Sequence, residues 1–225
     1  FEGQNLQYLK KGTSSAESTT LSFWVKSAKT GTYIAEFRDI DNTRNISKSY
    51  TISSADTWEK KTITFPGDTS GAFGNDHGSS LELNLWLAAG SSNTSGTLQT
   101  NWGSQVAANR AVGQVNLGDS TSNEWYVTGV QLEAGQTSSD FEFLPFDVNE
   151  RRCFRYFYNL VDVPGGDSQG YFAAGYLYNA NRLYFLINFF VEMRGTPTVS
   201  AASGTNYYHF YRNSAEDSFN TIIGT

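Results

Sequence analysis

Indole rings beside polar side chains are the clearest chemical signal in this 225-residue chain. Trp24 and Trp86 alternate with apolar residues, and Trp102 follows Asn101 in a segment rich in Gly and Asn, with Arg110 nearby. A flat aromatic face stacks on the C–H face of a pyranose, while polar side chains bond its hydroxyl groups. These five residues are therefore candidate carbohydrate-binding residues. The alternative interpretation is that the indoles fill a second core or anchor a long loop.

Carboxylates offer a second chemistry, the hydrolysis of glycosidic bonds, which requires two acids roughly 5 to 9.5 Å apart. No spacing in the sequence distinguishes such a pair from ordinary surface acids. No nucleophile-elbow serine accompanies the chain's two histidines. We therefore expect no catalytic residue and no enzymatic activity. The residues considered are Glu82, Glu124, Glu133, Glu142, His77 and His209.

Oxygen ligands for a calcium ion are the third candidate chemistry. Asp68 and Asp76, the latter next to Asn75, lie in one irregular segment, but their spacing is not that of an EF-hand loop. A solvated loop is the alternative, so we expect either no cofactor or a structural calcium ion on Asp68 and Asp76. Cys153, the only cysteine, excludes an internal disulfide and is interpreted as a small packed side chain.

Composition excludes several classes of protein. The chain is 17% charged and 15% aromatic, the reverse of a disordered composition. Residues 62–147 carry one basic residue against nine acids, so the basic footprint of a nucleic-acid partner is missing. No apolar run approaches the roughly 18 residues that cross a bilayer, so we expect no membrane partner. Since the chain begins at Phe1 and its only Met is Met193, we interpret it as a processed or partial stretch of a longer protein.

Alternation of apolar and polar residues predicts the fold. In residues 81–87 four leucines share one face, which we assign to the core, while Glu82, Asn84 and Trp86 share the other. Seven or eight such segments separated by Gly, Ser, Asn, Asp or Thr predict an all-β, jelly-roll β-sandwich over residues 1–147. Loops 67–80 and 88–108 are the expected location of function. The predicted strands lie within 21–26, 33–38, 50–52, 63–65, 81–87, 126–132 and, more weakly, 112–117.

Residues 148–225 are denser in aromatic residues and are predicted to form a smaller β-rich domain, incomplete in this chain. A short helix over 147–155, capped by Asp147 or Asn149, is expected to open it. Aromatic strands are expected at 154–160, 171–178, 183–191 and 207–211. Segment 183–191 is apolar on both faces, which indicates burial in an assembly.

One stretch resembles a known family. Residues 124–135 read EWYVTGVQLEAG, and residues 140–142 (DFE) and 152–157 (RCFRYF) follow. This is similar to the "ITGVQLE-G … FE-RP … CQRYY" pattern of bacteriophage tail fibres and virion appendages; segments 58–61, 65–69 and 83–90 fit the same group. The resemblance covers most of residues 1–160. The chain departs from it at Leu144, Phe154 and Phe157, where Arg, Gln and Tyr are usual, which puts any shared polar contact at this junction in doubt.

The resemblance implies a jelly-roll domain similar to carbohydrate-binding modules, joined to a C-terminal head region, in a protein of the virion. We therefore expect a tail-fibre or capsid-fibre protein that attaches to host-surface glycan without catalysis. It is expected to form a homotrimer and to contact other virion proteins. The alternatives are a purely structural or decoration protein without glycan binding, and a polysaccharide depolymerase.

Overall fold

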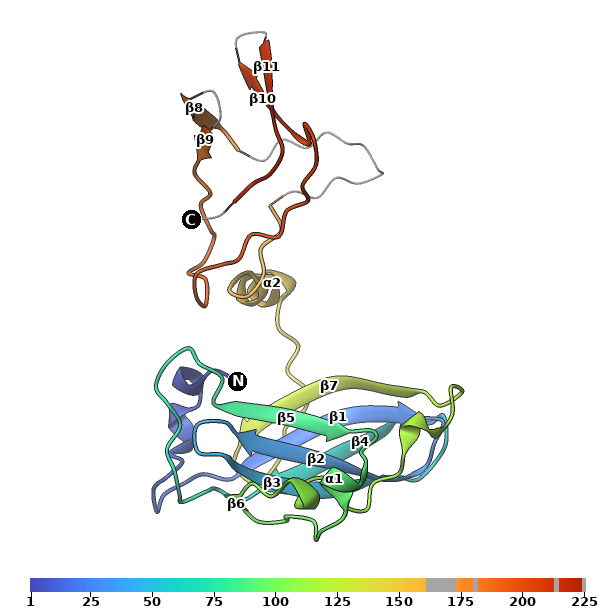
Figure 1. Cartoon of the computed structure of the whole chain (residues 1–225). Coiled ribbons are helices and arrows are strands. Elements are labelled where there is room, and N and C mark those ends of the chain that lie inside the picture. Colours follow the sequence, from blue (N-terminus) through green and yellow to red (C-terminus); the bar gives the residue numbers. More distant parts are fainter. Residues whose placement is uncertain (161–172, 180–181, 213–214, 224–225) are drawn as a thin grey trace. The chain divides into compact units, whose positions relative to one another are not determined.

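The computed structural model describes residues 1–160, 173–179, 182–212 and 215–223 (Figure 1). The chain divides into two compact units, Phe1–Glu142 and Phe143–Thr225. We call them the sandwich unit and the C-terminal unit. The division lies slightly before the expected boundary at residue 147, because helix α2 (Phe146–Phe154) belongs wholly to the C-terminal unit.

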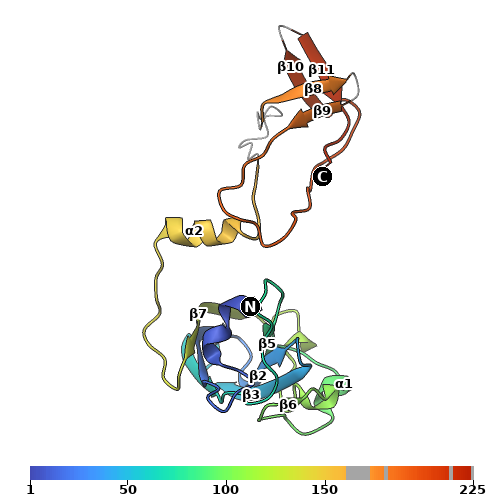
Figure 2. The same cartoon turned by 90° about the vertical axis from the view of Figure 1, so that its left-hand side faces the viewer.

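The sandwich unit consists of two antiparallel sheets packed face to face (Figures 1 and 2). One has the order β4-β1-β7 and the other β5-β2-β3-β6. The chain passes between the sheets repeatedly, as in a jelly roll, and the all-β prediction is confirmed. The strands are β1 (Thr19–Ser27), β2 (Gly31–Asp39), β3 (Arg44–Ile52), β4 (Glu59–Phe65), β5 (Leu81–Trp86), β6 (Gly103–Ser104) and β7 (Trp125–Ala134).

The core forms where the alternating apolar residues of the two sheets meet. Phe23 of β1 lies edge-on to Tyr50 of β3, with ring centroids 5.2 Å apart, and Phe37 of β2 packs 4.3 Å from Phe65 of β4. Burial of such side chains contributes roughly 1.5 to 3 kcal/mol each. The helical turns η1 (Gly3–Asn5) and η2 (Gln7–Leu9) precede β1. Leu6, between the two turns, and Leu9 of η2 are buried and join this core.

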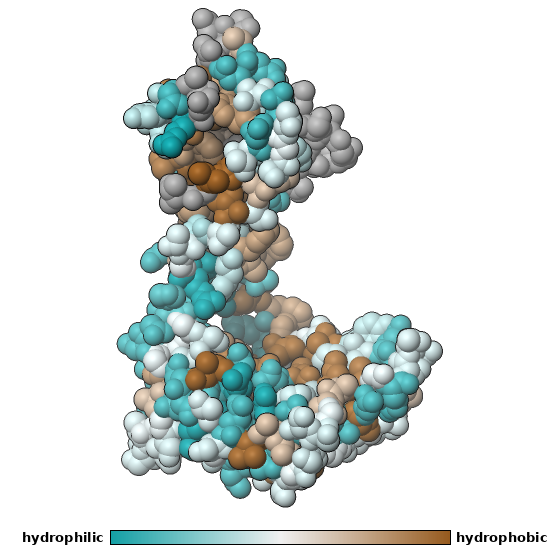
Figure 3. Space-filling model, viewed as in Figure 1, coloured by the Kyte–Doolittle hydropathy of each residue, from teal (hydrophilic) through white to brown (hydrophobic). Residues whose placement is uncertain are grey.

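The edge strand β5 departs from the pattern expected of it. Leu81 is buried, but Leu83 and Leu85 are only partly buried against the core. The reason is topological, because β5 and β7 are both edge strands and the core is less completely covered there. Figure 3 shows apolar atoms at the surface of the sandwich unit along this side, where Val127 of β7 is also exposed.

The outer face of the four-stranded sheet is covered by residues 88–118. This segment contains α1 (Ser91–Thr94) and the turns η3 (Ala107–Asn109) and η4 (Leu117–Asp119). It donates and accepts hydrogen bonds along β3, and Ile34 and Ser47 on that face are fully buried. The strand expected at 112–117 is wrong. These residues form turns and the start of η4, and Val115 and Leu117 pack against the core.

The C-terminal unit contains α2 and two hairpins. Strand β8 (Gly175–Asn179) pairs with β9 (Arg182–Phe185), and β10 (Tyr208–Arg212) pairs with β11 (Ala215–Phe219). The predicted helix is confirmed, but Pro145 occupies its N-cap position and no side chain caps it. Residues 154–160 are not a strand, and 183–191 is a strand only to Phe185; part of the segment expected at 171–178 lies outside the described residues. Within the described ranges no helix is long and apolar enough to span a membrane.

Candidate functional site

Trp102 anchors its loop to the sandwich. Its ring is half-buried against the core, and its indole N–H donates to the carbonyl of Pro66 at 2.8 Å. The Nζ atom of Lys11 lies 5.5 Å from the ring centroid. Asn101, beside it, is exposed. The indole N–H and part of the ring are thus already engaged within the protein.

Trp86 and Arg110 are brought together by a buried carboxylate. Glu36 is fully buried on the outer face of β2 and accepts two hydrogen bonds from Arg110, at 2.8 and 2.9 Å. It also accepts the indole N–H of Trp86 at 3.0 Å. The Arg110 guanidinium carbon lies 5.0 Å from the Trp86 ring centroid. The sequence analysis identified Trp86 and Arg110 but not Glu36, because an acid at an outward strand position is expected to be exposed.

Asp68 belongs to a buried ion cluster. Arg44 donates to both of its oxygens, at 2.7 and 2.9 Å, and the Lys11 ammonium lies 3.1 Å away and also contacts Asp39. Burial opposes ionisation of Asp68, but the bonds from Arg44, the Ser70 N–H and Lys11 outweigh it and lower the pKa of this carboxyl. The hydrogen bonds that Arg44 donates to Asp68 likewise raise the pKa of the Arg44 guanidinium.

This ion cluster bears on the calcium hypothesis. Both oxygens of Asp68 are engaged by cations, while Asp76 is exposed and accepts the N–H of Gly78. The described residues contain no group of three or more His, Cys, Asp or Glu side chains arranged to hold a metal ion. The geometry does not support a calcium site shared by Asp68 and Asp76.

Trp24 differs from the other two candidate indoles because it is exposed. It lies on the outer face of the three-stranded sheet with 42% of its surface accessible. Its neighbours across the strands are Lys60 of β4 and Thr128 of β7. No group in the described part of the chain accepts a hydrogen bond from its indole N–H, so both a ring face and a donor are available to a ligand.

Two further aromatic residues, Trp58 and Tyr126, share this face. Together with Lys26 they form what we call the stacked row. The Lys26 ammonium lies 5.7 Å from the Trp58 ring centroid and 4.7 Å from that of Tyr126. The strand register explains the row. Lys26 of β1 pairs with Tyr126 of β7, and Val25 pairs with Glu59 of β4, which follows Trp58, so each of three adjacent chain segments supplies one member. Trp58 is 43% exposed and Tyr126 is 42% exposed.

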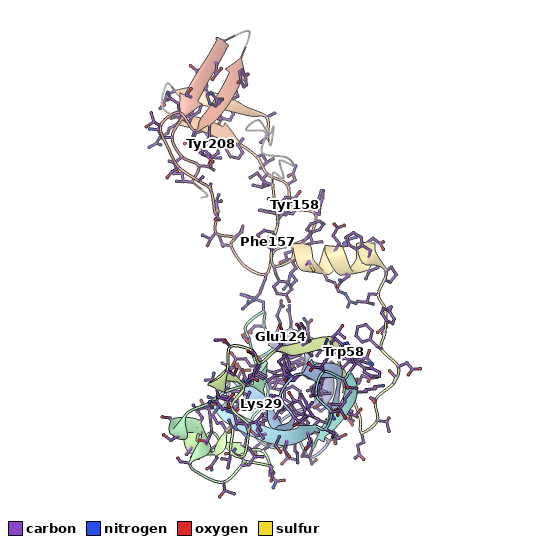
Figure 4. All side chains as sticks on the ribbon, turned by 90° about the vertical axis from the view of Figure 1, so that its right-hand side faces the viewer. Lys29, Trp58, Glu124, Phe157, Tyr158 and Tyr208 are labelled. Carbon is purple, nitrogen blue, oxygen red and sulfur yellow. The ribbon has the colours of Figure 1, made fainter. Side chains whose placement is uncertain are left out.

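Local hydrogen bonds hold both ends of the stacked row; Figure 4 labels Trp58 at one end and Glu124 at the other. Beside Trp58, Glu59 accepts the backbone N–H groups of Ser53 and Ser54, each at 2.8 Å, and pairs with Lys61. The bond from Lys61, with those from the backbone, lowers the pKa of Glu59. At the other end the Tyr126 hydroxyl donates to Glu124 at 2.6 Å, which raises the pKa of Tyr126.

A glycine bulge completes the face beside Trp24. The register of β1 and β7 shifts between Ser22 and Trp24, opposite Gly129, which has φ of +58°. A Cβ at Gly129 would lie 3.4 Å from the Trp24 ring and 3.7 Å from Phe141. Phe141 belongs to the segment 139–142. Gln131 of β7 holds this segment by accepting a hydrogen bond from the N–H of Glu142 at 2.8 Å.

Of the three aromatic residues on this face, the sequence analysis identified Trp24 as a candidate binding residue but not Trp58 or Tyr126. Trp58 directly precedes β4 and continues the outward alternation of Lys60 and Thr62, and Tyr126 is outward on β7 by the same rule. The signal was therefore present, but the partner of each strand was not known, so the three aromatic side chains could not be assigned to one sheet face.

Three of the four acids considered for catalysis have local partners. Glu82 pairs with Arg38 at 3.3 Å, Glu124 bonds to Tyr126, and Glu133 accepts the Ser139 N–H and hydroxyl. The bond from Ser139 is the main cause that lowers the pKa of Glu133. Comparison with protein-family models, curated proteins and solved structures gave no match. The fold and this face together define an all-β sandwich that presents exposed aromatic side chains on one face of a sheet.

Proposed function

We propose that the sandwich unit binds glycan without catalysis through the stacked row and Trp24. The observation that carries this proposal is that three aromatic side chains, each 42 or 43% exposed, lie on one sheet face. Large exposed aromatic residues on a flat surface are rare in a protein that has no ligand or partner for them.

The surroundings of these rings favour a sugar over an apolar partner. Lys60, Thr62 and Thr128 are exposed on the same face and supply donors and acceptors for hydroxyl groups. The Lys26 ammonium, held between two rings, adds a charged donor that is already desolvated on two sides. A pyranose presents the matching combination of an apolar C–H face and a hydroxyl rim.

The biological setting we propose is the one implied by the resemblance to phage virion appendages. In that setting the face would attach a virus particle to host-surface glycan. One such shallow face binds weakly, and repetition over several copies raises avidity by roughly 10² or more.

A glycan array on the purified chain, followed by calorimetry on the best ligand, tests this proposal. Trp24→Ala and Trp58→Ala are each expected to weaken binding about tenfold, the loss of roughly 1.4 kcal/mol of stacking. Tyr8→Ala is the matched control, because Tyr8 is 53% exposed and lies outside this face. No binding to any glycan by folded protein would contradict the proposal and favour the purely structural alternative.

A further inference from the structure

One face of helix α2 carries arginine side chains and lies beside a second stretch of the C-terminal unit. The backbone N–H of Arg194 donates to the carbonyl of Arg155 at 2.9 Å, and the Arg155 guanidinium donates to the carbonyl of Glu192 at 3.3 Å. These bonds hold residues 191–194 beside the end of α2 (Figure 1). Five residues of α2 and its C-cap share this helix face by their spacing: Asp147, Val148, Arg151, Arg152 and Arg155.

These side chains, together with Val191 and Glu192, line an open groove that we call the α2 groove. Its volume is about 490 Å³, within the roughly 300 to 1,000 Å³ of small-molecule sites. Val148 and Val191 give the groove apolar surface, and its three arginines give it planar, charged hydrogen-bond donors. The groove therefore combines the two kinds of surface that a small anionic ligand with an apolar part requires.

The positive charges of the α2 groove are not fully compensated within the described residues. In that part of the chain, no hydrogen bond or ion pair engages the guanidinium group of Arg151 or Arg152. Asp147 and Glu192 form no ion pair with either of them, so the groove has three bases against two acids. The helix dipole favours basic residues in the last turn of α2, but it does not require a groove beside them. Two arginines that line a groove with free donors indicate an anionic ligand.

We propose that the α2 groove binds the oxyanion of a small ligand, a phosphate or a carboxylate, through Arg151 and Arg152. A guanidinium group donates two parallel hydrogen bonds to either kind of oxyanion. Arg155 is a positioning residue, because its bond to the carbonyl of Glu192 holds the second wall of the groove in place. The body of the ligand packs on Val148 and Val191. The proposal does not depend on glycan binding, because the α2 groove and the stacked row lie in different units.

An NMR titration of the isotope-labelled full chain with three small probes tests this proposal. The probes are glycerol phosphate, glycerate and glycerol, which carry a phosphate, a carboxylate and no charge, and none of them presents a pyranose face to the stacked row. We expect at least one anion to shift the side-chain N–H signals of Arg151 and Arg152, and added salt to weaken its binding. The anion that binds more tightly identifies the source of the oxyanion. The indole signal of Trp24 should not move.

Variants localise the site. Arg151→Gln and Arg152→Gln each remove one charged donor group, and each is expected to weaken binding by at least about tenfold. Arg182→Gln is the matched control, because Arg182 is exposed on β9 and lies outside the α2 groove. Unchanged circular dichroism shows that the fold of each variant is intact.

Three results would overturn the proposal. One is the absence of any shift with either anion at about 10 mM, above the millimolar Kd of a weak ligand. The others are equal binding of glycerol by the natural chain and equal weakening of anion binding by Arg182→Gln.

Discussion

Glu36 is a fully buried carboxylate whose two oxygens accept five hydrogen bonds from four residues. Arg110 supplies two of them, and Asn45, Asn84 and Trp86 supply one each. The ion pair is thus completed by amide and indole donors, the condition under which a buried charge is tolerated. Since these donors come from β3, β5 and the cover segment, the carboxylate ties the cover to the sheet.

Removing the cation from this site should be costly. Arg110→Ala leaves the Glu36 charge buried without a counter-ion, and we expect a loss of about 3 to 5 kcal/mol in the free energy of unfolding, measured with urea. The double variant Glu36→Gln with Arg110→Met has no unpaired charge and should recover a large part of this loss. Equal instability of the single and double variants would show that the charge is not the cause.

Asp68 should make stability depend on pH. Its pKa is lower in the folded protein than in the unfolded chain, so it contributes stability above the unfolded value of about 3.9 and loses it as the pH falls toward the folded value. The difference in unfolding free energy between the natural chain and Asp68→Asn should be large at pH 7 and shrink below about pH 4. Urea titrations at pH 7, 5 and 3 measure it; a difference independent of pH would refute the assignment.

At the scale of the element, alternation predicts strands well because it reports which residues share a face. It located β1, β2, β5 and β7 to within a few residues. It could not show which strands are neighbours, so the three-segment stacked row was not foreseen. It also could not show that residues from 88–118 cover an outer sheet face, so the full burial of Glu36, Asn45 and Ser47 was not predicted.

The bulge at Gly129 gives the element-scale prediction. A side chain there has room, at 3.4 Å from Trp24, but φ of +58° is strained for any residue with a Cβ. We expect Gly129→Ala to lower the unfolding free energy by about 1 to 2 kcal/mol. Gly129→Asn should lower the free energy of unfolding less than Gly129→Ala, since Asn tolerates this conformation. Gly90→Ala, in open space with φ of −81°, is the control and should be neutral.

At the scale of the whole molecule, the two units draw stability from different sources. The sandwich unit contains all the buried residues of the described chain, whereas the described residues of the C-terminal unit are exposed or half-buried. The sandwich unit is therefore expected to supply most of the cooperative unfolding of the chain.

Calorimetric melting should separate the two units. We expect the main cooperative transition to come from the sandwich unit, which contains the buried core. Arg110→Ala should lower the midpoint of this transition, whereas Leu186→Lys, at a residue that is 77% exposed in the C-terminal unit, should leave it unchanged. Equal shifts by the two variants would contradict this division of the molecule.

The five tryptophans also give the sandwich unit an optical readout. Trp24 and Trp58 are exposed, whereas Trp86, Trp102 and Trp125 are half-buried. Iodide in solution should therefore quench the emission of the first two preferentially, and a ligand seated on the stacked row should shield them from it. The unequal burial of the indoles thus allows occupancy of this face to be followed by fluorescence on the natural chain, without an added dye.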